Sequence, residues 1–353
     1  MLHIKSLIKK YAPLIWDAHL KLRTKLSTFK VNQFNRKYRK AISNLYDEVF
    51  FEDKLNKLNS KKNTGYYIIA LQNPDLGIYG YLNFYLPHIA YALSKGLIPI
   101  IDMQNYHCIY QENHENAWER FYLQPCGVGL EEIRDKKTFI QRCPTDFWYH
   151  WLPSSQPLMS DRDIVMWSHI YSAFIHYNDK SKSYLADEMK RVLLEPEKTI
   201  GVIYRGGAYT KGKAKGHPVQ PTMKMLADKV QEMMRRNHCN YIYLASDEKS
   251  IVKYMNSRFP GKILINRRMY FDEVEDLDFT KYNDGTLVIK PDCFHRENNE
   301  YLMGIEYISS MNLVANCRYL VAGACGGTTA VLYMNGGKFA EKYIFDLGRY
   351  GQE

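Results

Sequence analysis

The stretch TIGVIYRGGAYTKGKAKGHP, residues 199–218, decides the fold of the second half of this 353-residue chain. It opens with an apolar run typical of a buried parallel strand, and two glycines follow Arg205 where that strand ends. Similar runs recur at 241–246, 262–266 and 318–323, with segments of helical periodicity between them. Because short apolar strands that alternate with helices build parallel sheets, this half predicts a doubly wound α/β domain.

The first half shows the same alternation in a shorter form. Strands are predicted at 66–71 and 97–102, and the helix between them is expected to end at Lys95–Gly96, a common helix C-terminus. Segment 103–160 predicts loops and short helices, whereas 161–195 predicts a helix. We therefore expect two Rossmann-like domains that face each other across a cleft. The helices expected in the second half lie at 221–236, around 251–255, at 299–316 and at 327–335.

Composition and charge divide the chain into a basic helical extension at 1–60, an N-terminal α/β domain at 64–195 and a C-terminal Rossmann-like domain at 196–353. The extension holds 13 Lys and Arg against 5 Asp and Glu, which supplies most of the net charge of +10. Two interpretations of it stay open. It forms either an amphipathic helix on an anionic membrane surface, or a helix that packs on the body and keeps a solvated charged face.

Several classes of protein are disfavoured by composition. Because the chain beyond residue 60 is nearly neutral, a nucleic-acid binder with a basic folded face is not expected. The seven cysteines are scattered without a CxxC pair, which favours reduced thiols over a disulfide framework or a zinc site. No apolar run approaches the ~20 residues of a membrane span, and the N-terminus does not resemble a signal peptide. The expected location is the cytoplasm.

Polar and glycine residues follow three of the predicted strands, at the edge where ligands bind in parallel sheets. Arginine offers a rigid fork of donors to phosphate oxygens, and glycines let backbone N–H groups approach an anion. These segments therefore predict a nucleoside diphosphate site. Each has a plainer alternative: an ion pair at Arg205, a helix N-cap at Asp247, and tight packing at 326–329. The residues concerned are Arg205, Gly206 and Gly207, then Ser246, Asp247 and Glu248, then Gly326, Gly327 and Thr328.

The order and spacing of these segments resemble the catalytic domain of the α1,6-fucosyltransferase family, within the wider fucosyltransferase superfamily. The family has a His-Pro pair twelve residues after its first loop arginine, as His217 stands after Arg205. YLASDE at 243–248 matches the family's YLATDD, and LVAGACGG at 320–327 stands where the family has LVCTFSSQ. More faintly, 77–96, which contains Gly80, resembles the family's glycine-rich first loop and helix.

The resemblance implies a GT-B-like, inverting glycosyltransferase that uses no metal and no cofactor. Arg205 would hold the β-phosphate of a donor, expected to be GDP-fucose, and Gly326, Gly327 and Thr328 would bind its diphosphate. Negative charge grows on the leaving diphosphate, so fixed cationic donors would stabilise it. The acceptor would be an oligosaccharide or lipid-linked glycan of bacterial surface or capsular polysaccharide synthesis. The basic extension would then hold the enzyme on the inner face of the plasma membrane.

The sequence also departs from the family pattern. Gly206 replaces the family's second arginine, and Lys213 stands where the family has a carboxylate implicated as the base. The acidic residue that reads guanine in the family falls at Ser310, and Glu306, one helical turn earlier, is expected to substitute for it. Because general-base catalysis needs a carboxylate or histidine within reach, the candidate bases are His217, Asp247, Glu248, Glu115 and Asp102.

Two alternative functions remain beside this prediction: transfer from another nucleotide sugar, and non-catalytic binding of a nucleotide sugar or glycan. The Asp276–Leu277–Asp278 sequence resembles the DxD motif of metal-dependent transferases, but it stands in an acidic stretch that predicts a solvated loop. Histidines 107, 114 and 150 lie among aromatic residues that would line an acceptor groove or pack in the core.

Overall fold

The computed structural model of the chain describes residues 65–73, 75–135, 139–143, 160–210, 213, 215–273, 279–281, 287–289 and 294–351. The predicted extension at 1–60 lies outside the described residues, and so do Asp276, Asp278 and His150.

A large parallel sheet forms the second half of the molecule, in the order β10-β9-β4-β5-β6. Its strands are β4 (Thr199–Tyr204), β5 (Tyr241–Ser246), β6 (Ile263–Leu264), β9 (Tyr319–Gly323) and β10 (Glu341–Phe345). Four of them match the predicted strands, whereas β10 was missed, since its sequence EKYIF holds two charged residues. The parallel order confirms the predicted doubly wound α/β class.

Strand β4 explains why its sequence is apolar at nearly every position. All of its residues are buried, because the sheet is covered on both faces. Ile200, Val202 and Tyr204 contact the core under α8 (Met223–Asn237) and α9 (Lys249–Arg258), while Ile203 belongs to the core on the opposite face. The opposite face is covered by α10 (Asn299–Ala315), which is buried on most sides.

A small parallel sheet, in the order β2-β1-β3, forms the other half. It consists of β1 (Tyr66–Ile69), β2 (Ile98–Ile101) and β3 (Ile140–Arg142). Helix α4 (Ile78–Lys95) connects β1 to β2 and ends at Gly96, whose φ of 68° is the left-handed conformation that the Lys95–Gly96 signal predicts. The helix begins earlier than the sequence suggests, inside a stretch that resembles a turn, and it contains Pro87.

The segment predicted as one helix at 161–195 is two helices, α5 (Asp161–Phe174) and α6 (Asp179–Val192). The break follows from local capping, because Ile175 is extended and the Asn178 side chain accepts the Ser181 N–H at 2.9 Å. Although the sequence places both helices before the boundary at Glu195–Pro196, α5 packs on α11 (Gly326–Asn335) and α6 packs on α10. The division into domains therefore stays a prediction.

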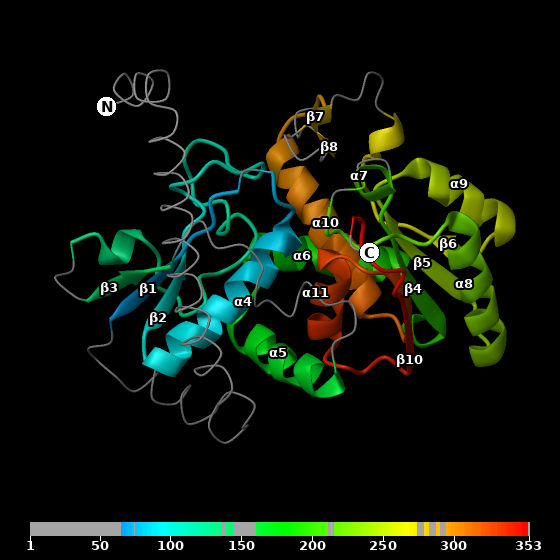
Figure 1. Cartoon of the computed structure of the whole chain (residues 1–353), viewed down its shortest axis with the longest axis horizontal. Helices are drawn as coiled ribbons and strands as arrows, with labels where there is room; N and C mark the ends of the chain where they lie inside the picture. Colours follow the sequence, from blue (N-terminus) through cyan, green and yellow to red (C-terminus); the bar gives the residue numbers. More distant parts are fainter. Residues whose placement is uncertain are drawn as a thin grey trace, which may run out of the picture.

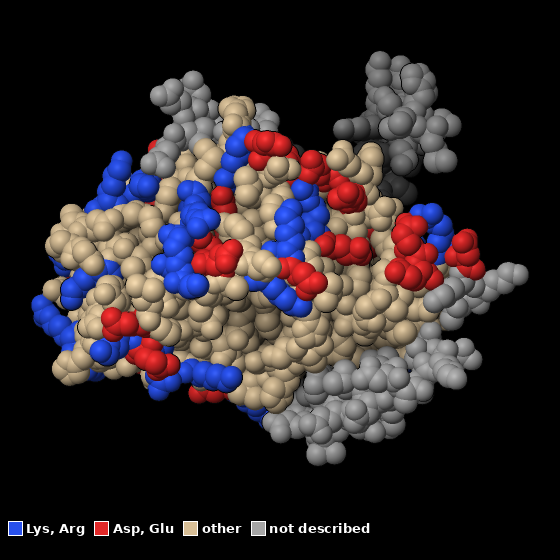
Figure 2. All heavy atoms as spheres, turned by 180° about the vertical axis from the view of Figure 1, so that it is seen from behind, with Lys and Arg blue, Asp and Glu red and all other residues tan. Residues whose placement is uncertain are grey.

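Helices α10 and α11 lie between the two sheets, and α4 packs on both of them (Figure 1). One apolar cluster runs from β1 through these helices to β9, so the two halves share a core. Basic and acidic side chains of the described residues are interspersed on the face opposite to that of Figure 1 (Figure 2). No helix in the described part combines the length and hydropathy that a membrane crossing requires. The remaining short elements are η2 (Glu131–Ile133), η4 (Pro196–Lys198), α7 (Gly207–Thr210), η5 (Phe271–Glu273), β7 (Phe279–Lys281) and β8 (Leu287–Ile289).

The contact between α10 and the first half yields a test of this shared core. A Cβ atom at Gly304 would lie 2.2 Å from Cζ of Phe121, whose ring stacks on Tyr301 with centroids 5.5 Å apart. Gly304→Ala should therefore lower the free energy of unfolding by about 1–3 kcal/mol, as overpacked cores do, although alanine is the better helix former. Denaturant unfolding measures this change. The double variant with Phe121→Leu should be more stable than the sum of the single effects, whereas a Gly304→Ala protein as stable as wild type would contradict the contact.

Candidate functional site

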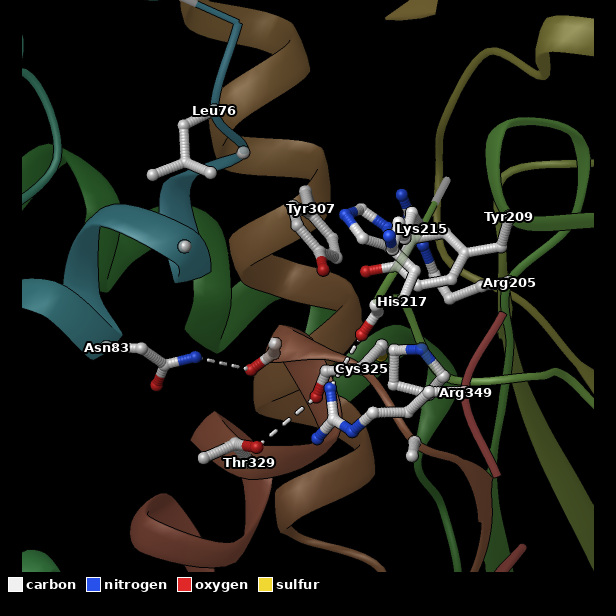
Figure 3. A pocket seen from close by; sticks show the side chains of 16 residues that line it. Leu76, Asn83, Arg205, Tyr209, Lys215, His217, Tyr307, Cys325, Thr329 and Arg349 are labelled. Atoms are coloured by element: carbon white, nitrogen blue, oxygen red, sulfur yellow. Dashed lines mark hydrogen bonds between the residues drawn. The ribbon is translucent and has the colours of Figure 1, made fainter. Parts of the chain in front are cut away.

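The order of strands reverses direction between β4 and β9, and a cavity of about 480 Å³ lies at that point. Arg205 follows β4, and Ala324 and Cys325 follow β9, so the carboxyl ends of two central strands supply part of its wall. In open parallel sheets, ligands bind in the crevice at such a switch point. The cavity is therefore the candidate functional site (Figure 3).

Both halves of the molecule line the cavity, and its lining is cationic. Among the described residues that line it, three are Lys or Arg and none is Asp or Glu. A lining of this kind favours an anionic ligand. The lining residues are Leu76, Gly77, Gly80, Asn83, Arg205, Tyr209, Lys215, Gly216, His217, Pro218, Tyr307, Ala324, Cys325, Gly326, Thr329 and Arg349.

The N-terminus of α11 opens into the cavity. Cys325 is its N-cap in an extended conformation, and the Cys325 thiol sulfur accepts the Thr328 N–H at 3.4 Å. Gly326 and Thr329 line the cavity, and the first turn carries no acidic residue. Because helix N-termini carry a partial positive charge and unpaired N–H groups, this end suits an anion.

The N-terminus of α4 reaches the same cavity from the first half. Its N-cap is Gly77, which provides no side-chain cap, and the Ile78 N–H donates to the Tyr110 hydroxyl at 2.9 Å. The Asn83 amide donates to the carbonyl of Gly326 at 3.1 Å, which ties the start of α4 to the start of α11. Two positive helix ends thus meet at one cavity.

Arg205 lines the cavity while an ion pair holds it in place. Its Nη1 lies 2.9 Å from Oδ2 of Asp247, and Oδ1 of the same carboxylate accepts the Gly206 N–H at 3.2 Å. The guanidinium also lies over the rings of Tyr209 and Tyr307, at 5.3 and 5.7 Å from their centroids. Burial is the largest single effect and by itself would lower the pKa of Arg205, but the charge of Asp247, together with Tyr307, Tyr209 and Cys325, raises that pKa overall, so Arg205 stays charged.

The two tyrosines beside Arg205 remain neutral. Burial raises the pKa of Tyr209 to about 12, against the lowering effect of Arg205, and burial raises the pKa of Tyr307 as well. Both phenols therefore keep their protons near neutral pH and can donate hydrogen bonds. They add polar donors to the cavity without adding negative charge.

The structure places Asp247 behind Arg205 and away from the cavity lining. Its side chain is 5% exposed, and both oxygens are engaged by Arg205 and the Gly206 N–H. The ion-pair alternative for Arg205 is thus confirmed, and the arginine still lines the cavity. The N-cap alternative for Asp247 is wrong, because the Asp272 carboxylate accepts the first N–H groups of α9, from Lys249 and Ser250.

Ser246 and Glu248, the neighbours of Asp247, make contacts within the fold and do not line the cavity. The Ser246 hydroxyl accepts the Glu248 N–H at 3.2 Å, both residues are buried, and neither is among the residues that line the cavity. The Glu248 side chain packs so close to Gly206 that a Cβ there would lie 2.1 Å from its Cδ. Gly207 begins α7.

Glu306, which was expected to recognise the guanine of the donor, forms an ion pair with Arg296 instead. Its carboxylate pairs with both Nη atoms of Arg296, at 2.6 and 3.0 Å, and it is not among the lining residues. The Ser310 hydroxyl donates to Oδ1 of Asn266 at 3.0 Å in a buried network, and Ser310 is not among the lining residues. On this stretch of α10, the residue that lines the cavity is Tyr307.

The glycine-rich turn divides between binding and packing. Gly326 lines the cavity, whereas Gly327 faces α10, where a Cβ would lie 2.8 Å from the Tyr307 hydroxyl and from the Met311 sulfur. The Thr328 hydroxyl donates to the carbonyl of Gly323 at 2.6 Å. The packing alternative therefore describes Gly327 and Thr328, and Thr329 is the threonine that lines the cavity.

His217 is the one proposed base found among the described lining residues. Its exposed ring lies 5.4 Å from that of Tyr209. The Asp102 carboxylate accepts the Gln104 and Asn105 N–H groups, and Glu115 lines a separate hollow. Lys213 is exposed and, like His107 and His114, does not appear in the lining.

Several lining residues were not predicted from the sequence, chiefly Asn83, Tyr209, Tyr307, Thr329 and Arg349. Tyr209 belongs to the loop after Arg205, and Thr329 follows the glycine-rich turn, so their place in the chain was a usable signal. Asn83 and Tyr307 depend on which face of a buried helix meets the cavity. Arg349 reaches the site only through the pairing of distant segments, which local sequence does not announce.

No cluster of three or more metal-ligating His, Cys, Asp or Glu side chains occurs in the described residues. The six cysteines in this part of the chain form no disulfide with one another.

Comparison with known proteins finds similarity at the level of structure alone. No family model and no curated protein matches the sequence. NodZ, a fucosyltransferase from Bradyrhizobium, matches with 12% identity over 82% of this chain and 98% of its own, at a TM-score of 0.47. NodZ α-1,6-fucosyltransferase soaked with GDP-fucose gives 12% identity with the same coverage and a TM-score of 0.49. POFUT1 in complex with GDP-fucose gives 10% identity over 82% of this chain and 99% of its own, at 0.45. NodZ bears the name of the α1,6-fucosyltransferase family that the sequence motifs resemble.

The ion pair between Arg205 and Asp247 is expected to stabilise the folded protein. Asp247→Ala should lower the free energy of unfolding by about 1–3 kcal/mol, less than for a fully buried pair because the Arg205 side chain is 24% exposed. Denaturant unfolding checks this value. The control is Asp228→Ala, which removes exposed pairs with Lys224 and Arg258 and should change stability little. Equal effects of the two variants would show that Asp247 does not hold Arg205 in place.

Proposed function

We propose that this protein is a glycosyltransferase that binds a nucleoside-diphosphate sugar in the cavity at the switch point and transfers the sugar to a glycan hydroxyl. The observation that carries this proposal is the cavity lining. Two helix N-termini and three cationic side chains meet there, and its described residues include no carboxylate. A diphosphate is the common biological group that combines this charge with a size suited to two helix ends.

The size of the cavity supports a ligand larger than phosphate alone. About 480 Å³ lies within the range of pockets for small molecules and cofactors, roughly 300–1,000 Å³. Apolar and aromatic residues, among them Leu76, Tyr209 and Tyr307, line it beside the cationic groups. Rings and apolar surfaces of this kind contact sugar and base faces.

Arg205 is the group best suited to stabilise the leaving diphosphate. Glycosyl transfer passes through an oxocarbenium-like state while negative charge grows on the departing phosphate. Because Asp247 and two aromatic rings fix the guanidinium before the reaction, little reorganisation is needed when that charge develops. We propose that this arrangement, with the two helix N-termini, serves where other transferases use a metal ion.

His217 is proposed as the base that takes the proton of the acceptor hydroxyl. It is a lining residue, and a neutral imidazole accepts a proton near neutral pH. Direct attack of a deprotonated hydroxyl on the donor sugar would invert the configuration at its anomeric carbon. An inverting reaction is therefore part of the proposal.

The donor is proposed to be GDP-fucose, on the strength of the motifs around Arg205 and His217. Glu306 is not proposed to read the guanine, because Arg296 occupies its carboxylate. We further propose bacterial surface or capsular polysaccharide synthesis as the setting. The basic composition of residues 1–60 supports a position at the inner face of the plasma membrane.

A binding screen tests the nucleotide class. Thermal unfolding of the full chain would be followed with GDP, UDP, CDP and dTDP and with their sugars, each at a concentration far above the expected Kd. A ligand at 100 times its Kd stabilises by about 2.7 kcal/mol, so the true nucleotide should raise Tm by several degrees and the others should not. A uniform absence of any shift would refute the proposed function.

Arg205→Ala is the sharpest test of the mechanism. Transfer from the donor found in the screen should fall by about 10²–10³-fold, the effect of losing one oxyanion donor. Arg205→Lys should restore only part of the rate, because an ammonium lacks the fork of donors. Single-turnover assays with radiolabelled donor measure both variants, with Arg318→Ala, far from the cavity at an exposed pair with Glu197, as the control. Wild-type rates in Arg205→Ala would remove the residue from the mechanism.

A second candidate function is non-catalytic binding of a nucleotide sugar. The absence of any carboxylate from the described lining favours it, since His217 is then the lone candidate base among those residues. The two functions are separated by turnover: a binding protein would shift in the thermal screen but would neither hydrolyse nor transfer the sugar.

A further inference from the structure

We propose that Arg349 is the second cation of the diphosphate site and supplies the charge that distinguishes a diphosphate from a monophosphate. This inference rests on the proposed function, because it assigns a role within the same cavity. Three observations carry it: the way the C-terminal segment is docked, the polar contacts of the guanidinium, and the contrast with Arg205.

Arg349 is delivered by the segment that follows β10, which pairs with the loop after Arg205. Residues 348–350 and 216–219, here called the C-terminal clip, form an antiparallel bridge between Pro218 and Arg349. Backbone hydrogen bonds hold the clip together: Gly216 N–H to Tyr350 O at 2.8 Å, Val219 N–H to Gly348 O at 2.9 Å and Tyr350 N–H to His217 O at 3.0 Å. The register of this pairing fixes where the arginine stands.

The pairing directs the Arg349 side chain into the cavity. Gly348 adopts a φ of 80° and Gly351 a φ of 68°, left-handed conformations that let the segment turn on both sides of the arginine. Arg349 is half-buried and lines the cavity, as Cys325 and Thr329 at the start of α11 do, whereas the Arg205 guanidinium lies over the ring of Tyr209 (Figure 3). The two arginines therefore meet the cavity at different places.

The charge of Arg349 is not balanced as that of Arg205 is. Its Nη1 donates to the carbonyl of Gly216 at 2.8 Å, and it takes part in none of the ion pairs found among the described residues. Arg205 is paired with Asp247 at 2.9 Å, so that pair contributes geometry but little net charge. A guanidinium has five N–H donors, and one contact with a carbonyl leaves most of them for phosphate oxygens.

A diphosphate can use both arginines, but a monophosphate cannot. One phosphoryl group would meet Arg205 and the other would meet Arg349 at the N-terminus of α11. A second charge-assisted contact of this kind strengthens binding by about one to two orders of magnitude. Arg349 therefore acts as a specificity-determining residue for the diphosphate, through direct contact with it.

The test compares inorganic pyrophosphate with orthophosphate in calorimetric titrations of the full chain. Arg349→Gln keeps a donor for the Gly216 carbonyl and removes the charge. We expect pyrophosphate affinity to fall about 10–100-fold and orthophosphate affinity to change less than about threefold. Arg349→Lys should fall between wild type and Arg349→Gln, because it keeps the charge without the fork. Arg318→Ala, an exposed arginine paired with Glu197, is the matched control and should leave both affinities unchanged.

Amide hydrogen exchange shows whether Arg349→Gln removes only the contact with pyrophosphate or also disrupts the C-terminal clip. Slow exchange of the Val219 and Tyr350 N–H groups in Arg349→Gln would show that the clip persists, so that weaker pyrophosphate binding supports the inference. Pyrophosphate affinity within threefold of wild type overturns it, and so does an equal loss for both phosphates. A wild-type protein that binds no pyrophosphate overturns it too.

The outcomes also distinguish this inference from the proposed function. If wild type binds pyrophosphate in the Arg349-dependent way but transfers no sugar from any donor, transfer is refuted and the assignment of Arg349 stands. If transfer proceeds and Arg349→Gln leaves pyrophosphate affinity intact, the glycosyltransferase proposal stands and this inference fails.

Discussion

The mutual repulsion of positive groups around one cavity is the constraint on which the site depends. The N-termini of α4 and α11 meet there with Arg205, Lys215 and Arg349, and the described lining contains no carboxylate. Asp247 balances the charge of Arg205, so the repulsion is mainly that of the remaining positive groups, and it costs free energy that the fold must recover elsewhere. It does so through the apolar cluster shared by the two sheets and through the hydrogen bond from Asn83 to the Gly326 carbonyl. An anionic ligand that entered the cavity would relieve the repulsion, so binding of such a ligand is expected to stabilise the arrangement.

Much of this arrangement could be predicted from local sequence, because strand ends and glycine turns are local signals. Arg205, after its strand, and Gly326, in the glycine-rich turn, both line the cavity, and the parallel α/β class followed from the alternation of apolar runs. The start of α4 could not be found in the same way. Its sequence resembles a turn, and at the helix N-terminus that forms there Tyr110, from a distant segment, accepts the Ile78 N–H. The sequence contains the donor and the acceptor but does not show that they meet.

The direction of side chains on buried helices was the second feature that could not be predicted from the sequence. Helix α10 is buried on most of its surface, so periodicity does not tell which residues face the cavity and which face the core. Glu306 was expected at the site, but Arg296 binds its carboxylate, while Tyr307 lines the cavity. Arg349 marks a third limit, since its position depends on an antiparallel bridge to a loop more than a hundred residues earlier in the chain. Such pairings are set by tertiary packing, and a single sequence carries no trace of them.

The division of work between the two arginines follows from what catalysis requires. A cation that stabilises a transition state must be in position before charge develops, and an unpaired guanidinium on a flexible side chain is not. Asp247 and the rings of Tyr209 and Tyr307 fix Arg205, but the same carboxylate cancels most of its attraction for a ligand in the ground state. The attraction between Arg205 and the leaving oxygen grows as negative charge accumulates on that oxygen. Only interactions that strengthen in the transition state in this way raise the rate. Ground-state attraction must then come from groups without a carboxylate partner among the described residues, which in this cavity are the two helix N-termini, Lys215 and the arginine of the C-terminal clip.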